Sequence, residues 1–350
     1  MSGSSQDMKV CMYYSNSDVR CQAMPRPCPG PGEILVKVMA SGICGSDVME
    51  WYRRDKVPLV LGHEVAGEVV EIGEGVEKFA PGDRVAVTHH VPCNTCSYCL
   101  SGHHTMCETL LKKTRFDPGG FAEYLRVPAI NVDRGTFAIP EGVSYEEASF
   151  MEPLACVLRG KKQAGLRPGQ TVLMLGAGIS GLLHLALARS LGAGLVIAAD
   201  TIPFRLKKAR EMGAHLALEA GPYLQEELRA ANQGLKADLV IIGFEGFIPL
   251  AMNCVERGGT VLFFAGAGEG ATLDVPINDI FWRTEVTLTS SYAGAPADCL
   301  QALKLIAAGA VPVKEMITHR LSLEDAQEGF KAVCNPVAHD SIKVIIQPHG

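Results

Sequence analysis

The glycine-rich turn near the middle of the chain constrains the fold more than any other sequence feature. A predicted strand, residues 171–175, runs directly into Gly176-Ala-Gly178-Ile-Ser-Gly181, an apolar helical run follows, and Asp200 ends the next predicted strand. In this order the first glycine permits a tight turn, the second lets the backbone approach a pyrophosphate, and the third lets helix and strand pack closely. The N–H groups that begin the helix would face the phosphates. The pattern therefore predicts a dinucleotide-binding βαβ unit.

The acidic residue at the end of the second strand indicates which dinucleotide binds. Asp200 lies about 20 residues beyond the motif, where a carboxylate can accept hydrogen bonds from both ribose hydroxyls. The same carboxylate would repel a 2′-phosphate, so NAD is expected rather than NADP. Arg205 and Lys207 are near enough to weaken this preference, although a solvated helix face explains them equally well. The candidate cofactor-binding residues are Gly176, Gly178, Ile179, Ser180, Gly181, Asp200 and Arg205.

Two different patterns of secondary structure divide the chain. The first 150 residues contain short strands separated by Gly, Pro and Asp, whereas strands and helices alternate from about residue 170 onward. The first pattern is typical of a barrel-like β domain and the second of a parallel, doubly wound sheet. We therefore expect an α/β chain of two domains. The predicted strands are 34–39, 65–72, 84–88, 171–175, 195–199, 237–242, 260–264, 286–289 and 341–347, and the predicted helices are 178–192, 204–212, 222–232, 297–308 and 323–333.

Charge and composition exclude several classes of function. The net charge is −6, so no basic surface can neutralise nucleic-acid phosphates, and nucleic-acid binding is not expected. The longest stretch without Asp, Glu, Lys or Arg, residues 168–188, contains the three glycines of the motif and begins as a strand, so no membrane span is expected. The first residues are polar and do not look like a secretory signal. We therefore expect a cytoplasmic protein in which the 12 cysteines do not form structural disulfides and the clustered cysteines bind metal.

Four cysteines in the segment PCNTCSYCLSGHHTMC form the strongest metal signal. Two residues separate Cys93 from Cys96 and Cys96 from Cys99, and Cys107 follows after seven more. This spacing lets four thiolates converge on one ion, and four thiolates around Zn²⁺ form a closed structural site. An iron–sulfur cluster is the main rival, but there the fourth cysteine follows after three residues and precedes proline. A free zinc ribbon that binds nucleic acid is a second rival, and unrelated or redox-active thiols are a third.

A second set of metal-binding residue types is spread over the first 155 residues. Cys44 lies in GICGSD, His63 and Glu64 lie in LGHE, and Glu152 lies in MEPL. Each residue alone has a structural explanation, as a core cysteine, a hydrogen-bonded histidine or a helix-capping carboxylate. Together with a nucleotide-binding domain, one thiolate, one imidazole and one carboxylate suit a catalytic zinc that keeps an open fourth position.

These motifs give the chain a resemblance to the zinc-dependent medium-chain alcohol dehydrogenases, and within them to the sorbitol, polyol and threonine dehydrogenase branch. The matching segments are GICGSD (42–47), GHEVAGEV (62–69), GDRVAV (82–87), GGFAEY (119–124), EPLAC (152–156), GAGISG (176–181), THRLS (318–322) and the four-cysteine segment. The resemblance covers nearly the whole chain. It implies a GroES-like β-barrel catalytic domain at 1–155 with a structural zinc lobe at 90–110, a Rossmann NAD-binding domain at 156–294, and a return to the catalytic domain at 295–350.

The resemblance also implies roles for individual residues. The catalytic zinc ligands map onto Cys44, His63 and Glu152, and Glu64 enters or leaves the coordination shell in some relatives. Cys156 is an alternative third ligand, but Glu152 is favoured because the polyol branch has a carboxylate there. The implied cofactors are NAD and two zinc ions per chain, one catalytic and one structural. The relatives are commonly dimers or tetramers, and a homotetramer is expected.

The implied reaction is the reversible oxidation of a secondary alcohol to a ketone, with hydride passing to the nicotinamide. Zn²⁺ would act as a Lewis acid on the hydroxyl oxygen, and Ser46 matches the family's proton-relay hydroxyl. The expected catalytic residues are therefore Ser46, Glu64 and Glu152. Many relatives have a relay histidine where this chain has Met49, so the outer half of the relay is not accounted for.

The substrate is expected to be a polyol, a cyclitol or a similar hydroxylated small molecule. Sorbitol dehydrogenases typically have Arg-Tyr where this chain has Ser291-Tyr292, which argues against sorbitol itself. Tyr292, Trp51 and Phe116 are weaker candidates for the pocket wall. Oxidation of an amino alcohol, as by L-threonine 3-dehydrogenase, is the alternative within the family. A zinc-free quinone reductase shares the fold, but it should lack both groups of metal-binding residues, which this chain has. A non-enzymatic binding protein is a further alternative, and the presence of all the metal-site residue types argues against it.

Overall fold

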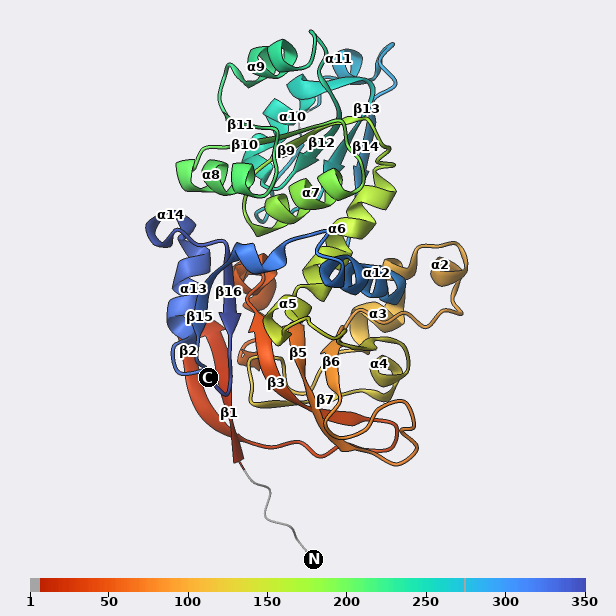
Figure 1. The fold of residues 1–350 in the computed structure, drawn as a ribbon, viewed down its shortest axis with the longest axis vertical. Helices are drawn as coiled ribbons and strands as arrows, with labels where there is room; N and C mark the ends of the chain where they lie inside the picture. The colour runs from red at the N-terminus through yellow and green to blue at the C-terminus, as the bar shows by residue number, and fades with distance from the viewer. Residues whose placement is uncertain (1–6, 274) are drawn as a thin grey trace, which may run out of the picture. The chain divides into compact units, whose positions relative to one another are not determined.

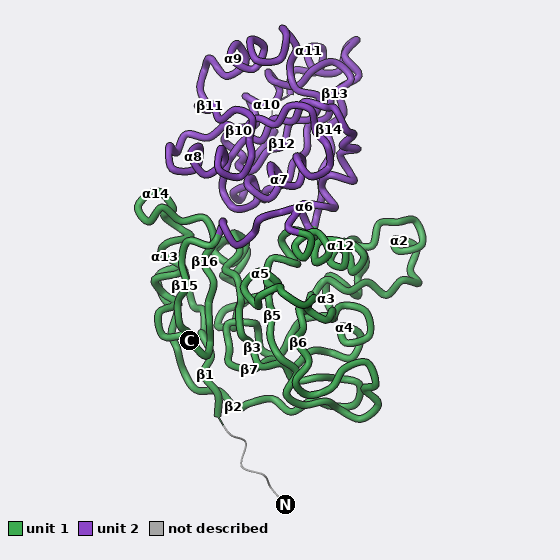
Figure 2. The backbone as a smooth tube through the Cα atoms, viewed as in Figure 1, with its two compact units in different colours: residues 1–155, 293–308, 317–350 green, residues 156–292, 309–316 purple. Residues whose placement is uncertain are grey.

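The computed structural model describes residues 7–273 and 275–350, which form two compact units (Figure 2). The chain returns to unit 1 at Ala293, two residues before the expected position 295. Within this returning part, Gly309–Met316 belongs to unit 2. Unit 1 consists of Met1–Ala155, Ala293–Ala308 and Ile317–Gly350, and unit 2 consists of Cys156–Tyr292 and Gly309–Met316.

Unit 1 is built around a seven-stranded sheet (Figure 1). Its strands are β3 (Ile34–Gly42), β5 (Glu64–Ile72), β6 (Arg84–Val87), β7 (Tyr124–Val127), β8 (Thr136–Ala138), β15 (Ile317–Leu321) and β16 (Lys343–Ile346). The order is β15-β16-β3-β5-β6-β8, and β7 also pairs with β3. Every pair is antiparallel except β15 with β16. Because side chains alternate along a strand, Ile34, Val36 and Val38 of β3 enter the same core cluster.

A second sheet of unit 1, with the order β2-β1-β4, was not predicted from the sequence. It consists of β1 (Asp7–Ser15), β2 (Asp18–Pro25) and β4 (Leu59–Val60). The sheet packs against α13 (Ala326–Cys334), where the rings of Tyr13 and Phe330 lie 5.4 Å apart. Strand β1 contains one β-branched residue, so its local preference for extended structure is weak. Pairing with β2 and burial of its side chains stabilise the strand instead.

The helices of unit 1 are mostly short. Three of them, α2 (Ser97–Leu100), η2 (His104–Met106) and α3 (Glu108–Lys112), form the lobe that contains the four clustered cysteines. The long helix α6 (Met151–Gln163) begins in unit 1 and continues into unit 2. The predicted helices 297–308 and 323–333 are found as α12 and α13. The helices are η1 (Gly45–Val48), α1 (Glu50–Arg53), α2 (Ser97–Leu100), η2 (His104–Met106), α3 (Glu108–Lys112), α4 (Ala129–Arg134), α5 (Tyr145–Ser149), α12 (Pro296–Ala307) and α14 (Pro336–His339).

Unit 2 contains the predicted parallel, doubly wound sheet, in which the strand order reverses at β9 (Figure 1). Its strands, in spatial order, are β11 (Leu216–Glu219), β10 (Leu195–Asp200), β9 (Thr171–Leu175), β12 (Ala237–Ile242), β13 (Val255–Phe263) and β14 (Thr287–Ser290). All five residues of β9 are buried, as expected for a central parallel strand covered on both faces. The helices are α7 (Ile179–Ser190), α8 (Pro203–Glu211), α9 (Leu224–Ala231), η3 (Glu245–Phe247), α10 (Ile248–Cys254), α11 (Ile277–Phe281) and η4 (Val313–Met316).

The predictions for unit 2 miss several elements. Strand β11 and helices α10 and α11 were not predicted, and β13 begins at Val255, five residues before the predicted start. The pair Gly258-Gly259 indicates a turn from sequence alone, but Val255 already pairs with Ala237 of β12. The uncharged stretch 168–188 contains β9 and most of α7. In the described chain, no helix combines the length and the apolar character needed to cross a membrane.

Two buried titratable side chains of unit 2 lack a hydrogen-bond partner in the described structure. They are Lys161 on α6, 2% exposed, and His184 on α7, fully buried. The His184 ring meets the Phe264 ring edge-on, with centroids 4.4 Å apart. Burial lowers the pKa of Lys161 to about 7, and burial together with Lys161 lowers the pKa of His184 well below its ordinary value. A buried amine without a partner costs free energy, so this pair reduces the stability of unit 2.

Replacing Lys161 by methionine, which fills a similar volume, should raise the free energy of unfolding at pH 7 by an amount on the order of 3 kcal/mol. The pKa of about 7 in the folded chain lies below that of an unfolded lysine. Above that pH the unfolded chain binds one more proton, so wild-type stability rises as the pH increases. The advantage of Lys161→Met should therefore shrink toward alkaline pH in chemical denaturation. An equal gain from Lys162→Met, at the exposed neighbouring position, would contradict this explanation.

Candidate metal centres and dinucleotide site

Three metal-binding side chains converge at one end of the β3–β5 pair in unit 1. Cys44 follows β3 as the N-cap of η1, His63 precedes β5, and Glu64 is the first residue of β5. The antiparallel register pairs Gly42 with Glu64, so the two segments lie side by side. A Cβ atom on Gly42 would overlap Glu64 Oε2, which explains the glycine. Ligand atoms of Cys44, His63 and Glu64 all lie within 4.8 Å of one another, and this donor set fits a zinc ion with an open position.

Asp47 connects the backbone at Cys44 to the ring of His63. Its carboxylate is fully buried, Oδ2 accepts a hydrogen bond from Cys44 N at 3.0 Å, and Oδ1 lies 3.5 Å from His63 Nδ1. Burial alone would raise the pKa of Asp47, but the His63 ring and the Arg53 guanidinium hold that pKa below its ordinary value. Because Nδ1 faces Asp47, Nε2 of His63 is left for a metal, as in other histidine ligands supported by a carboxylate.

Glu64 forms a buried ion pair with Lys343 of β16. The side chains are 1% and 0% exposed, and Lys343 Nζ also donates a hydrogen bond to the Ile43 carbonyl at 3.1 Å. Burial raises the pKa of Glu64, and the charge of Lys343 opposes that effect. A buried carboxylate needs a charged or hydrogen-bonding partner, so Lys343, from the last strand of the chain, holds Glu64 beside the other two ligand candidates.

Glu152, the predicted third zinc ligand, is buried in the first turn of α6 but does not belong to this group of three. Its Oε1 lies 3.1 Å from His90 Nδ1. Its charge adds to the effect of burial in raising the pKa of Glu64, so the two carboxylates are electrostatic neighbours. Cys156, one helical turn further along α6, belongs to unit 2. In the described structure, the carboxylate that meets Cys44 and His63 is therefore that of Glu64.

The predicted relay hydroxyl lies beside the thiol of the metal group. Both the backbone N–H and the hydroxyl of Ser46 donate hydrogen bonds to Cys44 Sγ at 3.4 Å. Arg53, in the last turn of α1, reaches back to the same serine, and its Nε donates to the Ser46 carbonyl at 3.1 Å. Met49 lies between η1 and α1.

Among the three candidates for the pocket wall, Phe116 is linked to the metal group through ring contacts. Its ring centroid is 6.1 Å from that of His89, which is 5.1 Å from that of His63. Trp51 on α1 is 40% exposed. Tyr292 is 48% exposed and belongs to unit 2.

The four clustered cysteines also converge, in the lobe of α2, η2 and α3, with their sulfur atoms within 4.8 Å of one another. The N–H groups of Thr95 and Cys96 donate to Cys93 Sγ at 3.4 and 3.3 Å, and Cys93 N donates to Cys107 Sγ at 3.3 Å. The Thr95 hydroxyl and these N–H groups lower the pKa of Cys93 to about 5. Four converging sulfur atoms, two of which accept backbone N–H bonds that favour the thiolate form, fit a closed structural zinc site.

The glycine turn between β9 and α7 has the conformation that the motif requires. Gly176 has a φ angle of 98°, which only glycine adopts readily. A Cβ atom on Gly181 would overlap the carbonyl oxygen of Gly176, so the third glycine permits the close approach of helix and strand. Gly178 is the N-cap of α7 and has no capping side chain, and Ile179 and Ser180 begin the helix. The N–H groups at this helix start fit a pyrophosphate.

Asp200, at the end of β10, is buried and stabilises this turn through hydrogen bonds to the backbone. Its Oδ2 accepts a hydrogen bond from Ala177 N at 2.6 Å, and its Oδ1 accepts one from Ile202 N at 2.9 Å. Arg205 Nη1 lies 3.9 Å from Asp200 Oδ2, and the Arg205 guanidinium would be 3.5 Å from a Cβ atom on Gly178. The turn is thus flanked by a carboxylate that suits ribose hydroxyls and by a guanidinium that suits phosphate.

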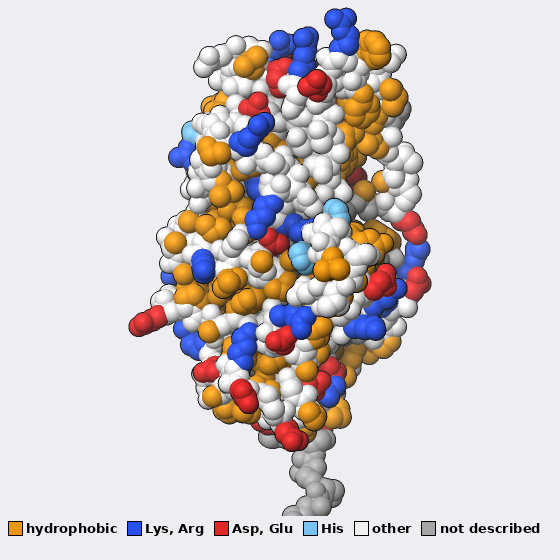
Figure 3. Space-filling model, turned by 90° about the vertical axis from the view of Figure 1, so that its right-hand side faces the viewer, with side chains coloured by type: hydrophobic (Ala, Val, Ile, Leu, Met, Phe, Trp, Pro, Cys, Tyr) orange, Lys and Arg blue, Asp and Glu red, His pale blue; other side chains and the backbone are white. Residues whose placement is uncertain are grey.

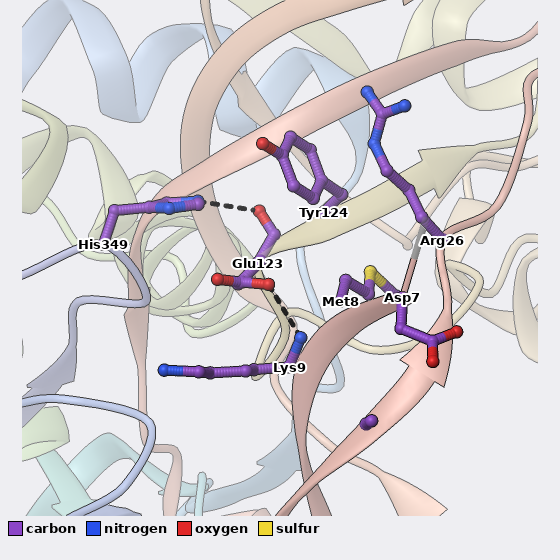
Figure 4. A pocket seen from close by; sticks show the side chains of 8 residues that line it. Asp7, Met8, Lys9, Arg26, Glu123, Tyr124 and His349 are labelled. Atoms are coloured by element: carbon purple, nitrogen blue, oxygen red, sulfur yellow. Dashed lines mark hydrogen bonds between the residues drawn. The ribbon is translucent and has the colours of Figure 1, made fainter. Parts of the chain in front are cut away.

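Two surface pockets lie away from these residues. One, of about 510 Å³, is lined by β1, β2, β7 and the C-terminal segment of unit 1 (Figure 4). Its cations are already paired within the protein, Lys9 with Glu324 and Arg26 with Glu71, each at 2.6 Å. The other, of about 480 Å³, lies beside η3 and α10 of unit 2. None of the predicted site residues lines either pocket, so these two hollows do not identify the site.

Three residues that support the metal group, Asp47, Lys343 and His90, were not predicted from the sequence. Asp47 had a detectable signal, because an acidic residue three positions after an N-cap is typical of a capping box. Lys343 and His90 had none, because each meets its carboxylate only through the fold of unit 1.

Comparisons with known proteins agree with this geometry. Residues 30–139 match the family model described as the alcohol dehydrogenase GroES-like domain, and residues 180–308 match that described as zinc-binding dehydrogenase. The sorbitol dehydrogenase of Ovis aries is 34% identical over 331 residues, which cover 91% of each chain. The chain belongs to the zinc-dependent alcohol dehydrogenase family. It is an oxidoreductase of the sorbitol dehydrogenase-like branch that acts on alcohols with NAD or NADP. The sequence predicted this branch and this class of reaction.

Solved structures confirm the fold of this dehydrogenase, a GroES-like domain with a Rossmann-type sheet. A protein of Sinorhizobium meliloti 1021, described as a zinc-binding dehydrogenase and bound to NADP, is 31% identical, with a TM-score of 0.85 and coverage of 98% of this chain and 100% of the other. The 2R,3R-butanediol dehydrogenase of Bacillus subtilis is 26% identical, with a TM-score of 0.80 and coverage of 98% and 100%.

Metal analysis should find two zinc ions per chain of this dehydrogenase. Cys44→Ala should lose one ion and keep the other, and Cys96→Ala should do the reverse, because the two groups of ligand atoms are separate. Elemental analysis after gel filtration measures the content. A single zinc that survives both substitutions would contradict the assignment of two sites.

Proposed function

We propose that this dehydrogenase reversibly oxidises a secondary alcohol of a polyol, cyclitol or similar hydroxylated molecule to the ketone, with NAD as the hydride acceptor. The convergence of Cys44, His63 and Glu64 is the observation that carries the proposal. In it, Cys44 and His63 would hold the catalytic zinc together with a carboxylate, that of Glu152 as the family resemblance implies or that of Glu64, which lies beside them, and the four-cysteine lobe would hold the structural zinc.

The side chains around the metal group prepare it for this chemistry. A bound zinc ion would supply a Lewis acid that favours negative charge on the alcohol oxygen. The Asp47 carboxylate faces Nδ1 of His63 and so fixes the orientation of the ring. Lys343 forms a buried ion pair with Glu64. The Ser46 hydroxyl lies beside Cys44, and it can accept a proton from the substrate while it passes its own proton onward.

The glycine turn of unit 2 holds the cofactor in this proposal. The N–H groups at the start of α7 bind the pyrophosphate, Asp200 binds the ribose hydroxyls, and Arg205 contacts the phosphate side of the turn. Asp200 favours NAD over NADP because a 2′-phosphate would meet its charge. The buried position of the carboxylate and its bonds to the turn support this preference, since the charge cannot move away.

A panel of polyols, cyclitols, simple secondary alcohols and L-threonine with NAD⁺, followed by the absorbance of NADH, tests the proposal. We expect the highest kcat/KM with a polyol or cyclitol. Selective oxidation of L-threonine would move the activity to the amino-alcohol alternative. No turnover of any alcohol by the zinc-loaded enzyme would refute the proposed function.

Glu152→Ala should abolish turnover while the fold is retained, because a carboxylate next to the metal group is lost. Activity assays, circular dichroism and zinc analysis measure the effect. Glu141→Ala, which removes an exposed carboxylate of the same unit, serves as the control and should leave activity unchanged. Near-normal activity of Glu152→Ala would leave the third-ligand role to Glu64 or Cys156.

Asp200→Ala should lower the preference for NAD over NADP by roughly tenfold or more, because charge-assisted bonds to the ribose and the repulsion of a 2′-phosphate are both lost. It should also lower the melting temperature, because the bonds to Ala177 N and Ile202 N disappear. Steady-state kinetics with both cofactors measures the selectivity. If the ratio of kcat/KM values is unchanged, Asp200 does not discriminate between the cofactors.

We also propose that the chain forms a homo-oligomer, with a tetramer favoured over a dimer, and works in the cytoplasm. Strand β14 is the edge of the unit 2 sheet, and Ile277, Phe281 and Trp282 nearby are exposed. Hydrophobic side chains are visible over the upper part of the face in Figure 3. An unpaired edge beside apolar side chains favours self-association. In the described residues no disulfide joins any of the 12 cysteines, which supports a reducing compartment. Light scattering on the purified protein would refute the oligomer by yielding a monomer mass.

A further inference from the structure

The buried carboxylate of Asp47 faces two side chains, the ring of His63 and the guanidinium of Arg53. A histidine that binds zinc does so as the neutral ring. His63 then offers Asp47 a hydrogen-bond donor at Nδ1 but no net charge. An ionised carboxylate that is fully buried is costly unless a cation faces it.

Arg53 is positioned to supply that charge. Its side chain is 13% exposed, and its Nη2 lies 3.5 Å from Asp47 Oδ1. The same oxygen lies 3.5 Å from His63 Nδ1, so one carboxylate oxygen meets both the ring and the guanidinium.

A second contact of Arg53 reaches the relay serine. Nε donates to the Ser46 carbonyl at 3.1 Å, and Nη2 lies 3.5 Å from the Ser46 hydroxyl oxygen. A guanidinium only donates hydrogen bonds and stays protonated. Arg53 therefore cannot take over the proton relay of the histidine that many relatives have in place of Met49. What it can do is keep the Ser46 segment in one position against the metal group. The planar fork of arginine suits two directions of donation, which a lysine ammonium on a flexible stem does not reproduce.

We propose that Arg53 is the positioning residue of this active site, which couples Ser46 to Asp47 and through Asp47 to His63. The proposal deepens the proposed function, since the positions of the relay hydroxyl and of the metal histidine both depend on one guanidinium. Arg53 itself does not touch the reacting atoms. It acts through the two residues that it contacts.

The variants Arg53→Met, Arg53→Lys and Arg54→Met test this role. Arg54 is the exposed neighbour and serves as the matched control, because its loss removes the same charge from the same segment. Each variant is characterised by kcat and KM for the alcohol and for NAD⁺, by the rate at which a chelator removes zinc, and by the visible spectrum after Co²⁺ replaces the catalytic zinc. The spectrum reports the geometry of the ligands whether or not a substrate is known.

We expect Arg53→Met to lower kcat and the retention of the catalytic zinc by roughly 10- to 100-fold, the usual effect of losing a group that supports a metal ligand. The Co²⁺ spectrum should change, the KM for NAD⁺ should not, and Arg54→Met should behave as the wild type. Arg53→Lys keeps the charge opposite Asp47 but loses the Ser46 contacts, so it should restore zinc retention and leave kcat low. This variant also tests the role if Arg53→Met does not fold.

Three results would overturn the proposal. The first is an Arg53→Met protein with wild-type kcat, zinc retention and Co²⁺ spectrum, even if its melting temperature is lower. The second is an equal loss in Arg54→Met, and the third is an Arg53→Lys protein as active as the wild type. If the wild-type enzyme oxidises no alcohol, the proposed function fails, whereas the chelator and Co²⁺ measurements still decide the role of Arg53.

Discussion

The antiparallel register of β3 against β5 is the constraint on which the metal site depends. It places Gly42 opposite Glu64, so that Cys44, just beyond one strand, meets His63 and Glu64 at the start of the other. A shift of one residue would turn every side chain of a strand to the opposite face. The buried side chains of the core cluster specify this register. The packing of unit 1 therefore also determines where the metal-binding side chains lie.

Around that point, unit 1 buries an unusual concentration of charge and balances it in pairs. Glu64 meets Lys343, Asp47 meets Arg53 and His63, and Glu152 meets His90. Each partner reaches the site from a different segment, including the last strand of the chain. Such pairs contribute little net stability compared with apolar packing, but the loss of one member leaves a buried charge without compensation. The site is therefore held in one arrangement by many groups that take no part in the reaction.

The two groups of metal ligands differ in how far they depend on the fold. The four cysteines lie within 15 consecutive residues, and local N–H groups already orient Cys93 and Cys107. The other group joins residues at the adjacent ends of two strands, and its supporting residues come from η1, α1, α6 and β16. A site that keeps a coordination position open for a substrate requires ligands fixed from outside, because the metal alone does not hold them.

The sequence by itself determined the elements whose signals are local. These are the strand–glycine–helix unit at Gly176, the parallel sheet of unit 2, the spacing of the four cysteines, and the residue types at Cys44, His63 and Glu64. Only the tertiary structure decided that the carboxylate of Glu64 lies beside Cys44 and His63, that Lys343 and Arg53 compensate the buried carboxylates, and that β1 pairs into a sheet. These contacts join residues far apart in the chain or depend on burial, and no periodicity or spacing records them. A local pattern follows from backbone geometry, whereas a partner for a buried charge is specified by whichever segments the packed core brings together.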